Sequence, residues 1–510
     1  MKTKKILALL LVVSMVAVLF AACAEEGGGD SEWTRPEDEG GDVDDAYPAA
    51  DYDNEDFTFL VIKHTDTTKD YYGGPYIDAE SYTGSVINDA VFERNLAVEE
   101  KYNVNITARE EINGDPAELL QTLVMSGEFN YDVIYGWGYK LGNCITQNYF
   151  ADFNTLQNVD YSKEYWSPSA TEDLTIAGKQ YLSINDISMN KLEWAGLLFY
   201  NKQLMEDYNV ESEFGASVYD LVREGKWTLD TYLNMLTVVS NDEDGDGSIT
   251  KNDVYGLVDG NGLGTFASNA SGVFNTIKND DDTYTISIYD QKVLNIAEKV
   301  HAVYSDSDYV KTYEELWEGA DTTGYQDMWE YARSFFAQDH ALFCAGNAYL
   351  TSEFRNMESE YGILPLPKYD ENQEQYYSTV DCLASIFAIP ATYRTDMSTA
   401  GPERTGMILE YMAAKSNEIL LPKYYDEVLS NQRLKDENDK EMMDLIRDTI
   451  RYEFTDMMGL TTFQETKDAI YENPNTAQST YTRAERRMEN ELTDFYLEVL
   501  AMAEKNESAE

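Results

Sequence analysis

The strongest constraint on the fold is an alternation of short β-type runs with longer runs of helical hydrophobic spacing. Between residues 57 and 135, the β-type runs are 57–62, 103–107 and 131–135, and the helical runs are 85–102 and 116–126. Strands that alternate with helices along a chain favour a parallel sheet with helices packed on its faces. The first part of the chain is therefore predicted to form an α/β unit.

The same alternation returns further along the chain. Strands are predicted at 196–200, 254–258, 341–345 and 384–389, with helices at 228–239, 291–304 and 326–338. Three more helical patterns follow, at 403–416, 438–452 and 478–504. Because 510 residues are too many for one core, we expect two α/β lobes. Each should be a mainly parallel sheet flanked by helices, and a helical C-terminal tail should follow.

The charge of the chain limits its partners. It has 94 Asp and Glu against 38 Lys and Arg, a net charge of −56. A field of that sign repels phosphate backbones, which excludes nucleic-acid binding. Hydrophobic residues make up 43% and aromatic residues 13% of the sequence, so the chain has the material for cores.

The N-terminus has the pattern of a secretory signal. Lys2, Lys4 and Lys5 precede an apolar run that ends in two alanines and Cys23. This ending resembles a bacterial lipobox, which implies cleavage before Cys23 and lipidation of its thiol. An uncleaved membrane anchor is the alternative. The acidic stretch that follows, to residue 55, is predicted to be a disordered tether, so the body should lie outside the cell membrane and be anchored to it.

The sequence gives no positive support for catalysis. It has three histidines and lacks the HExxH, GxSxG and Walker A motifs, so we expect a protein that is not an enzyme and has no catalytic cofactor. Carboxylate pairs for glycoside hydrolysis are too common among 94 acids to be informative. The remaining cysteines, Cys144, Cys344 and Cys382, allow at most one disulfide, and the apolar surroundings of Cys344 and Cys382 suggest buried thiols.

Residues 242–253 fit the pattern of a calcium-binding loop, with acids at alternating positions and a glycine at position 6. Asp253 stands where an EF-hand has Glu, and a strand pattern follows where an EF-hand has a helix. We therefore expect a structural Ca²⁺ site, with an acidic turn that holds no ion as the alternative. The predicted ligands are Asp242, Asp244, Asp246, Ser248, Thr250 and Asp253.

Aromatic residues near strand ends are the second functional signal. Trp137 and Tyr139 lie just past the predicted strand at 131–135, the end at which open α/β sheets bind ligands. Trp194 precedes the strand at 196–200, and Tyr349 follows the strand at 341–345. Sugars have apolar C–H faces and polar edges, so flat aromatic rings with acids and amides suit them. Packing in a core is the alternative for each ring.

Several segments, in this order, resemble the extracellular solute-binding proteins of family 1, the maltose-binding-protein-like lipoproteins of carbohydrate ABC importers. The segments are 199–204, 227–230, 335–349, 361–367 and 384–390. The resemblance implies a type II binding-protein fold, with two α/β lobes joined by crossover strands and a ligand between them. It also implies that Trp137 and Tyr349 stack on sugar and that Asp381 faces the same site.

Together these observations predict the domain organisation. Residues 1–22 would be the signal peptide and 23–55 the lipidated tether. Residues 56–180 with 375–425 would form the N-terminal lobe. Residues 181–374 with 426–510 would form the C-terminal lobe, which includes the calcium-type loop and the C-terminal helices.

The predicted function is capture of a sugar or oligosaccharide between hinged lobes and its delivery to the permease of an ABC transporter, by a monomer anchored through lipid. Three alternatives stay open: the same fold binding peptides or another polar metabolite, a surface glycoside hydrolase, and a surface adhesion protein that binds glycans without closing.

Overall fold

The structure is a computed structural model. It describes residues 47–63, 76–112, 116–127, 131–243, 245–259, 263–305, 308–318, 320–325, 327–391, 401–425 and 436–507. The predicted signal peptide, Cys23 and most of the predicted tether lie outside the described residues. Within the described part of the chain, no helix is both long enough and apolar enough to span a membrane.

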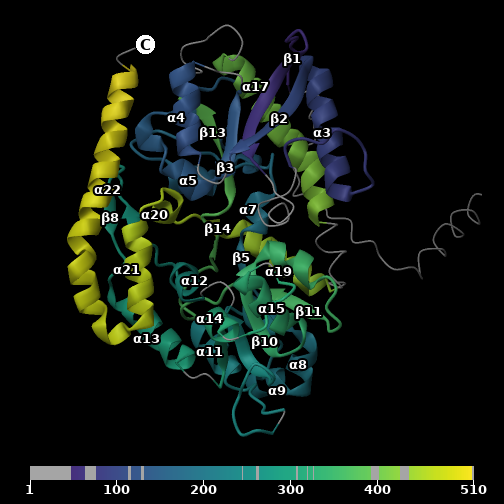
Figure 1. Ribbon diagram of the computed structural model, residues 1–510, viewed down its shortest axis with the longest axis vertical. Coiled ribbons are helices and arrows are strands. Elements are labelled where there is room, and N and C mark those ends of the chain that lie inside the picture. The colour runs from purple at the N-terminus through teal and green to yellow at the C-terminus, as the bar shows by residue number, and fades with distance from the viewer. Residues whose placement is uncertain are drawn as a thin grey trace, which may run out of the picture. The chain divides into compact units, whose positions relative to one another are not determined.

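One sheet forms around the first predicted strands (Figure 1). Its order is β2-β1-β3-β13-β4, in which β1 is parallel to β2 and β3, and β13 is antiparallel to β3 and β4. Phe57 to Ile62 of β1 are all buried, as expected of a strand covered on both faces. The strands are β1 (Glu55–Ile62), β2 (Val104–Ile112), β3 (Val133–Trp137), β4 (Phe150–Ala151) and β13 (Ser385–Pro390).

Two helices from distant parts of the sequence pack together beside this sheet. They are α3 (Val86–Tyr102) and α17 (Pro402–Lys415), and both contribute side chains to a core with β1, β2 and β3. The tether was predicted to extend to residue 55, but the structure places residues 47–54 against this lobe. Tyr47 donates to Glu410 Oε1 at 3.2 Å, and Tyr52 N donates to Tyr102 O at 3.0 Å. The two tyrosines give this acidic segment apolar surface to bury.

A second sheet forms around the later predicted strands. Its order is β11-β5-β10-β6-β9; β6 is parallel to β10 and β9, whereas β5 is antiparallel to both of its neighbours. Each sheet is therefore mixed, with three neighbouring parallel strands along one side: β2, β1 and β3 in the first sheet and β10, β6 and β9 in the second. The strands are β5 (Gly196–Asn201), β6 (Tyr255–Asp259), β9 (Val310–Thr312), β10 (Ala341–Asn347) and β11 (Tyr361–Leu364), and the helices include α11 (Leu229–Leu236), α13 (Gln291–Tyr304) and α15 (Met328–Ala337).

Three segments of the chain meet between the two sheets. Ala195 forms an antiparallel bridge with Val380. The short strands β12 (Ser378–Thr379) and β14 (Ile450–Arg451) pair in parallel. The helix predicted at 438–452 is shorter in the structure, where α19 (Glu437–Asp448) ends before β14, because the backbone there pairs with β12 instead of continuing the helix.

The C-terminal tail is helical, as predicted, and consists of α20 (Phe454–Met457), α21 (Thr461–Glu472) and α22 (Ala477–Glu507). It contacts elements of both lobes. α20 contacts α5 (Gly138–Gly142) and α6 (Pro168–Leu174), whereas α21 contacts α12 (Leu263–Ala270) and α13. Near its end, α22 exchanges side-chain hydrogen bonds between Asn506 and Asn148. The predicted lobe boundaries stay a prediction.

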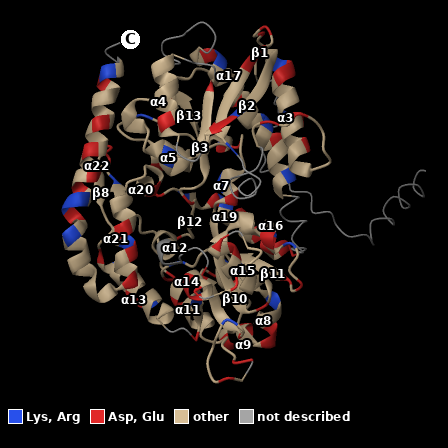
Figure 2. Cartoon of the chain, in the orientation of Figure 1, with Lys and Arg blue, Asp and Glu red and all other residues tan. Residues whose placement is uncertain are grey.

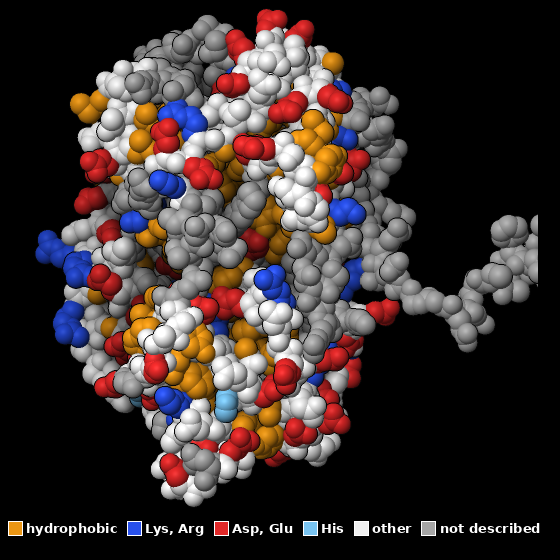
Figure 3. Space-filling model, turned by 45° about the vertical axis from the view of Figure 1, so that its right-hand side comes forward, with side chains coloured by type: hydrophobic (Ala, Val, Ile, Leu, Met, Phe, Trp, Pro, Cys, Tyr) orange, Lys and Arg blue, Asp and Glu red, His pale blue; other side chains and the backbone are white. Residues whose placement is uncertain are grey.

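Acidic residues are spread over the helices around both sheets, and basic residues are fewer (Figure 2). The face of the molecule in Figure 3 shows the same excess of acids. Such a surface matches the net charge of −56 and leaves the expectation against nucleic-acid partners unchanged.

Candidate functional site

One aromatic pair lies where β3 passes into α5. The rings of Trp137 and Tyr139 are nearly parallel, with centroids 6.4 Å apart and an angle of 10° between their planes, and both side chains are half-buried. Gly138 lies between them at a close approach: a Cβ there would lie 2.8 Å from Met457 Sδ and 3.2 Å from Cys382 O, so a larger residue would displace its neighbours. Its N–H donates to Ala384 O at 2.9 Å, which fixes the pair against the start of β13.

A second aromatic pair lies at the edge where β5 begins and β10 ends. Trp194 and Tyr349 have ring centroids 5.0 Å apart, at an angle of 44°. The antiparallel pairing of Gly196 with Asn347 brings these two ends together, and Ala348 N donates to Ala195 O at 3.1 Å. Trp194 is only 3% exposed, so nearly all of its ring surface is in contact with the rest of the protein.

The segment around Asp381 connects the two pairs. Asp381 N donates to Trp194 O at 3.1 Å, and Tyr139 N donates to Cys382 O at 3.2 Å. Asp381 and Cys382, which are adjacent in sequence, thus form backbone hydrogen bonds with one aromatic residue of each pair. The structure brings all five predicted ligand-binding residues to this one region: Trp137, Tyr139, Trp194, Tyr349 and Asp381.

Two carboxyl groups here have raised pKa values. Burial raises the pKa of Asp381, although Leu383 N donates to its Oδ1 at 2.9 Å and lowers it. Burial also raises the pKa of Glu193, which accepts hydrogen bonds from Tyr76 and from Asn190 Nδ2. Both carboxyl groups therefore hold a proton more readily than exposed acids do.

Asn347 is a candidate that the sequence reasoning missed. It is the last residue of β10 and is 1% exposed, and neither its amide oxygen nor its amide nitrogen has a hydrogen-bond partner within the described structure. A buried amide without partners costs free energy, and most such groups in proteins are paired. Its place in Gly346-Asn347-Ala348-Tyr349, directly after a buried strand, is the signal that could have found it.

A buried charged cluster from the C-terminal tail lies near Asp381. Glu453 Oε2 accepts from Asn275 N at 2.8 Å, and Lys467 Nζ lies 4.0 Å from Asp456 Oδ2. Burial and the charge of Asp456 raise the pKa of Glu453 to about 7. Burial is the main cause of the raised pKa of Asp381, and the charge of Asp456 raises it further. No sequence motif marks these residues, because they come together only through the tail's return to both lobes.

The predicted calcium loop is held by its own carboxylates. Asp242 accepts from the backbone of Gly245 and Gly247 at 2.7 Å each. Asp253, fully buried, accepts from Glu243 N at 2.9 Å and Thr250 N at 2.7 Å. Asp244 lies outside the described residues. Among those described, no group of three or more His, Cys, Asp or Glu is arranged to hold a metal ion, so calcium binding stays a prediction.

None of the three cysteines in the described structure forms a disulfide. Cys144 and Cys344 are buried, and Cys382 is half-buried. Burial raises the pKa of Cys344, so this thiol is inert at neutral pH.

No protein-family model matches the chain, and no curated protein matches it in sequence. Solved structures do match. An ABC substrate-binding protein from Listeria monocytogenes in complex with cycloalternan is 13% identical, with a TM-score of 0.52 over 87% of this chain and 100% of that one. A cyclo/maltodextrin-binding protein complexed with maltotetraose is 15% identical, with a TM-score of 0.52 over 88% of this chain and 97% of that one.

UspC from M. tuberculosis is 10% identical, with a TM-score of 0.51 over 86% of this chain and 100% of that one. At these identities the likeness is one of fold. The fold class that the sequence predicted is confirmed: this chain has the two-lobed α/β fold of ABC substrate-binding proteins.

Proposed function

We propose that this protein captures a sugar or oligosaccharide outside the cell membrane and delivers it to an ABC importer. The observation that carries the proposal is the meeting of two aromatic pairs from two different sheets at the Asp381–Cys382 segment. Flat rings with a nearby carboxyl and a buried amide match the faces and edges of a sugar. The fold neighbours with bound cycloalternan and maltotetraose support the same ligand class.

Capture would work by closure of the two lobes. A ligand that contacts Trp137 from the first lobe and Tyr349 from the second gains both contacts only when the lobes approach. It therefore shifts the population towards the closed state, which the permease would recognise. No bond in the ligand is made or broken, so none of these residues is assigned a catalytic role.

A thermal-shift panel tests the ligand class. Sugars, oligosaccharides and peptides are compared at constant calcium. A ligand at 100 times its Kd stabilises the native state by about 2.7 kcal/mol, which such a panel detects. A dose-dependent shift with one glycan class supports the proposal, whereas a response to peptides alone would assign the site to peptides. A panel with no response to any of these ligands would contradict the proposal.

A product assay on the same glycans separates binding from hydrolysis. The proposal expects every glycan that stabilises the protein to be recovered intact. Shorter products that appear with the folded protein and not with heat-denatured protein would assign the site to a glycoside hydrolase.

The membrane anchor is proposed from the sequence of the N-terminus. Lipid on the thiol of Cys23 would hold the protein at the outer surface of the cell membrane. Fractionation of cells that express the wild type and Cys23→Ser tests this. The wild type should stay with membranes and the variant should be released, whereas a variant that stays with membranes would indicate an uncleaved anchor.

A structural Ca²⁺ is proposed at residues 242–253 on the basis of the alternating oxygen ligands. Asp242, Asp244, Asp246, Ser248, Thr250 and Asp253 would hold it. Calorimetric titration of chelator-treated protein should show one saturable Ca²⁺ site that Asp246→Ala weakens. Equal heats from the two proteins would assign the loop to an acidic turn.

A further inference from the structure

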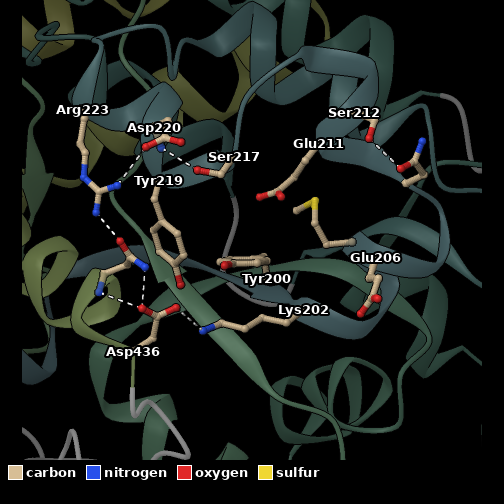
Figure 4. Close-up of a pocket in the computed structure, with 13 residues that line it drawn as sticks. Tyr200, Lys202, Glu206, Glu211, Ser212, Ser217, Tyr219, Asp220, Arg223 and Asp436 are labelled. Atoms are coloured by element: carbon tan, nitrogen blue, oxygen red, sulfur yellow. Dashed lines mark hydrogen bonds and ion pairs between the residues drawn. The ribbon is translucent and has the colours of Figure 1, made fainter.

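A pocket of about 610 Å³ lies in the second lobe, at the opposite end of β5 from Trp194 (Figure 4). It is formed by the end of β5, by the N-terminal part of α19 and the residue before it, and by three short helices: α8 (Lys202–Asp207), α9 (Val210–Phe214) and α10 (Val218–Arg223). The volume is within the range of small-molecule sites. Nothing in the sugar-binding proposal uses it.

The inner surface of this pocket is aromatic. Tyr200, Met205 and Tyr219 line it and are 3%, 4% and 6% exposed. Burial raises the pKa of both tyrosines, so their rings are neutral. One ring already faces an ammonium, since Lys202 Nζ lies 5.7 Å from the centroid of the Tyr219 ring.

The positive groups of the pocket are bound to acids of the protein. Arg223 Nη2 lies 2.6 Å from Glu441 Oε2, and Arg223 Nη1 lies 3.0 Å from Asp220 Oδ1. Lys202 Nζ lies 2.9 Å from Asp439 Oδ2, and that carboxylate is fully buried. These cations are therefore already compensated and leave little attraction for an anionic ligand.

Two other carboxylates of the pocket form no ion pair with any residue that the structure describes. The Glu211 carboxylate accepts a hydrogen bond from Val218 N at 3.0 Å, and in Figure 4 it points into the space above Tyr200. Glu206 also lines the pocket, and its carboxylate has no ion pair or hydrogen bond among the described residues. The uncompensated charge of the pocket is thus negative, next to a neutral aromatic surface.

We propose that this pocket binds a primary alkylammonium group. The ammonium would donate to Glu211 beside the small exposed part of the Tyr200 ring, because a charge-assisted hydrogen bond to a carboxylate favours a cationic ligand. The alkyl chain would lie along Met205. Free amines and lysine side chains both carry this group, and the proposed site would bind the alkylammonium group that they share.

Calorimetric titration of the purified protein with 1,5-diaminopentane and with Nα-acetyl-L-lysine methylamide, in 150 mM salt, tests the proposal. We expect saturable binding to the wild type, weakened at least tenfold in Glu211→Gln. Glu213→Gln is the matched control: it removes an exposed carboxylate of the same helix that does not line the pocket, and binding should stay within twofold.

Glu206→Gln is a second variant that tests the proposal if Glu211→Gln does not fold. The Glu206 carboxylate has no ion pair or hydrogen bond among the described residues, so its loss should leave the melting temperature unchanged and still weaken the binding of the amines severalfold. Tighter binding of diaminopentane would assign the site to free amines, and tighter binding of the lysine derivative would assign it to polypeptides. Absence of saturable binding, or an equal loss in Glu213→Gln, would overturn the proposal.

Discussion

The two aromatic pairs of the candidate sugar site differ in how much of their surface stays free. Trp137 and Tyr139 stack nearly parallel and are half-buried, whereas Trp194 is 3% exposed and tilted against Tyr349. The first pair lies between a strand and a short helix, and the second lies between two antiparallel strand ends. The same residue types thus form an open platform on one lobe and a packed wall on the other.

This difference separates ligand affinity from stability. A ring that is already packed contributes mainly to folding, because its contacts exist without ligand. A ring with a free face contributes mainly to binding, because its contacts form only with ligand. Variants of the two pairs should therefore show opposite patterns in unfolding and in titration.

The largest expected effect is that of Trp194→Ala on stability. Removal of a fully packed large aromatic side chain should lower the free energy of unfolding by about 3–5 kcal/mol. Chemical denaturation monitored by circular dichroism measures this. Trp329→Ala is the control, since Trp329 is 38% exposed, and it should cost much less. If both variants lose the same free energy of unfolding, Trp194 contributes no more to folding than the exposed Trp329 does.

The next effect concerns the pH dependence of the charged cluster beside the site. The pKa of Glu453 is about 7 in the folded protein and 4.5 ordinarily, so the folded state holds a proton that the unfolded state loses. This stabilisation is fully present below pH 4.5 and is lost as pH rises through 7. It amounts to at most about 3 kcal/mol.

Glu453→Gln should flatten this part of the stability profile, and Glu472→Gln, which removes an exposed acid of α21, should leave it unchanged. Denaturant unfolding between pH 4.5 and 8 measures both variants. A profile of Glu453→Gln that falls with pH as steeply as that of the wild type would contradict the assignment.

Trp137→Ala should have a smaller effect, on the free energy of ligand binding. Loss of one stacking face should weaken a bound oligosaccharide about tenfold or more, which corresponds to about 1.4 kcal/mol or above. Calorimetric titration with the glycan that gives the largest thermal shift measures it. If Trp137→Ala binds the glycan as tightly as Trp329→Ala does, the glycan does not stack on Trp137.

The smallest effect, on stability, is expected from Asn347→Leu. The amide has no hydrogen-bond partner among the described residues, so an apolar side chain of similar size should raise the unfolding free energy by about 1 kcal/mol. The same change should weaken the sugar, since a hydrogen-bonding group is lost from the site. A variant that is less stable and binds normally would assign Asn347 to the fold alone.

Most of the fold follows from hydrophobic spacing. Helices α3 and α13 were predicted to within one residue, because the buried positions of both repeat at helical spacing. The helix at 438–452 was predicted too long, since β14 forms only through pairing with β12, a partner about 70 residues away. Local pattern does not contain that contact.

The candidate site shows the same limit. Trp137 and Tyr349 could be nominated because a ligand site at strand ends is a property of the fold class. Glu453 and Lys467 could not, because the tail brings them to the crossover through helices that carry no motif. Asn347 was visible in the sequence but became distinctive only when its buried amide proved to lack partners.

The central claim, that rings from both lobes close on one sugar, is tested most directly by small-angle X-ray scattering. The purified protein is measured with and without a saturating amount of the glycan that gives the largest thermal shift. The account predicts a smaller radius of gyration with ligand, and no change in Trp137→Ala at a glycan concentration that it does not bind. An unchanged radius of gyration in the saturated wild type would contradict closure and favour a glycan-binding surface protein that does not move.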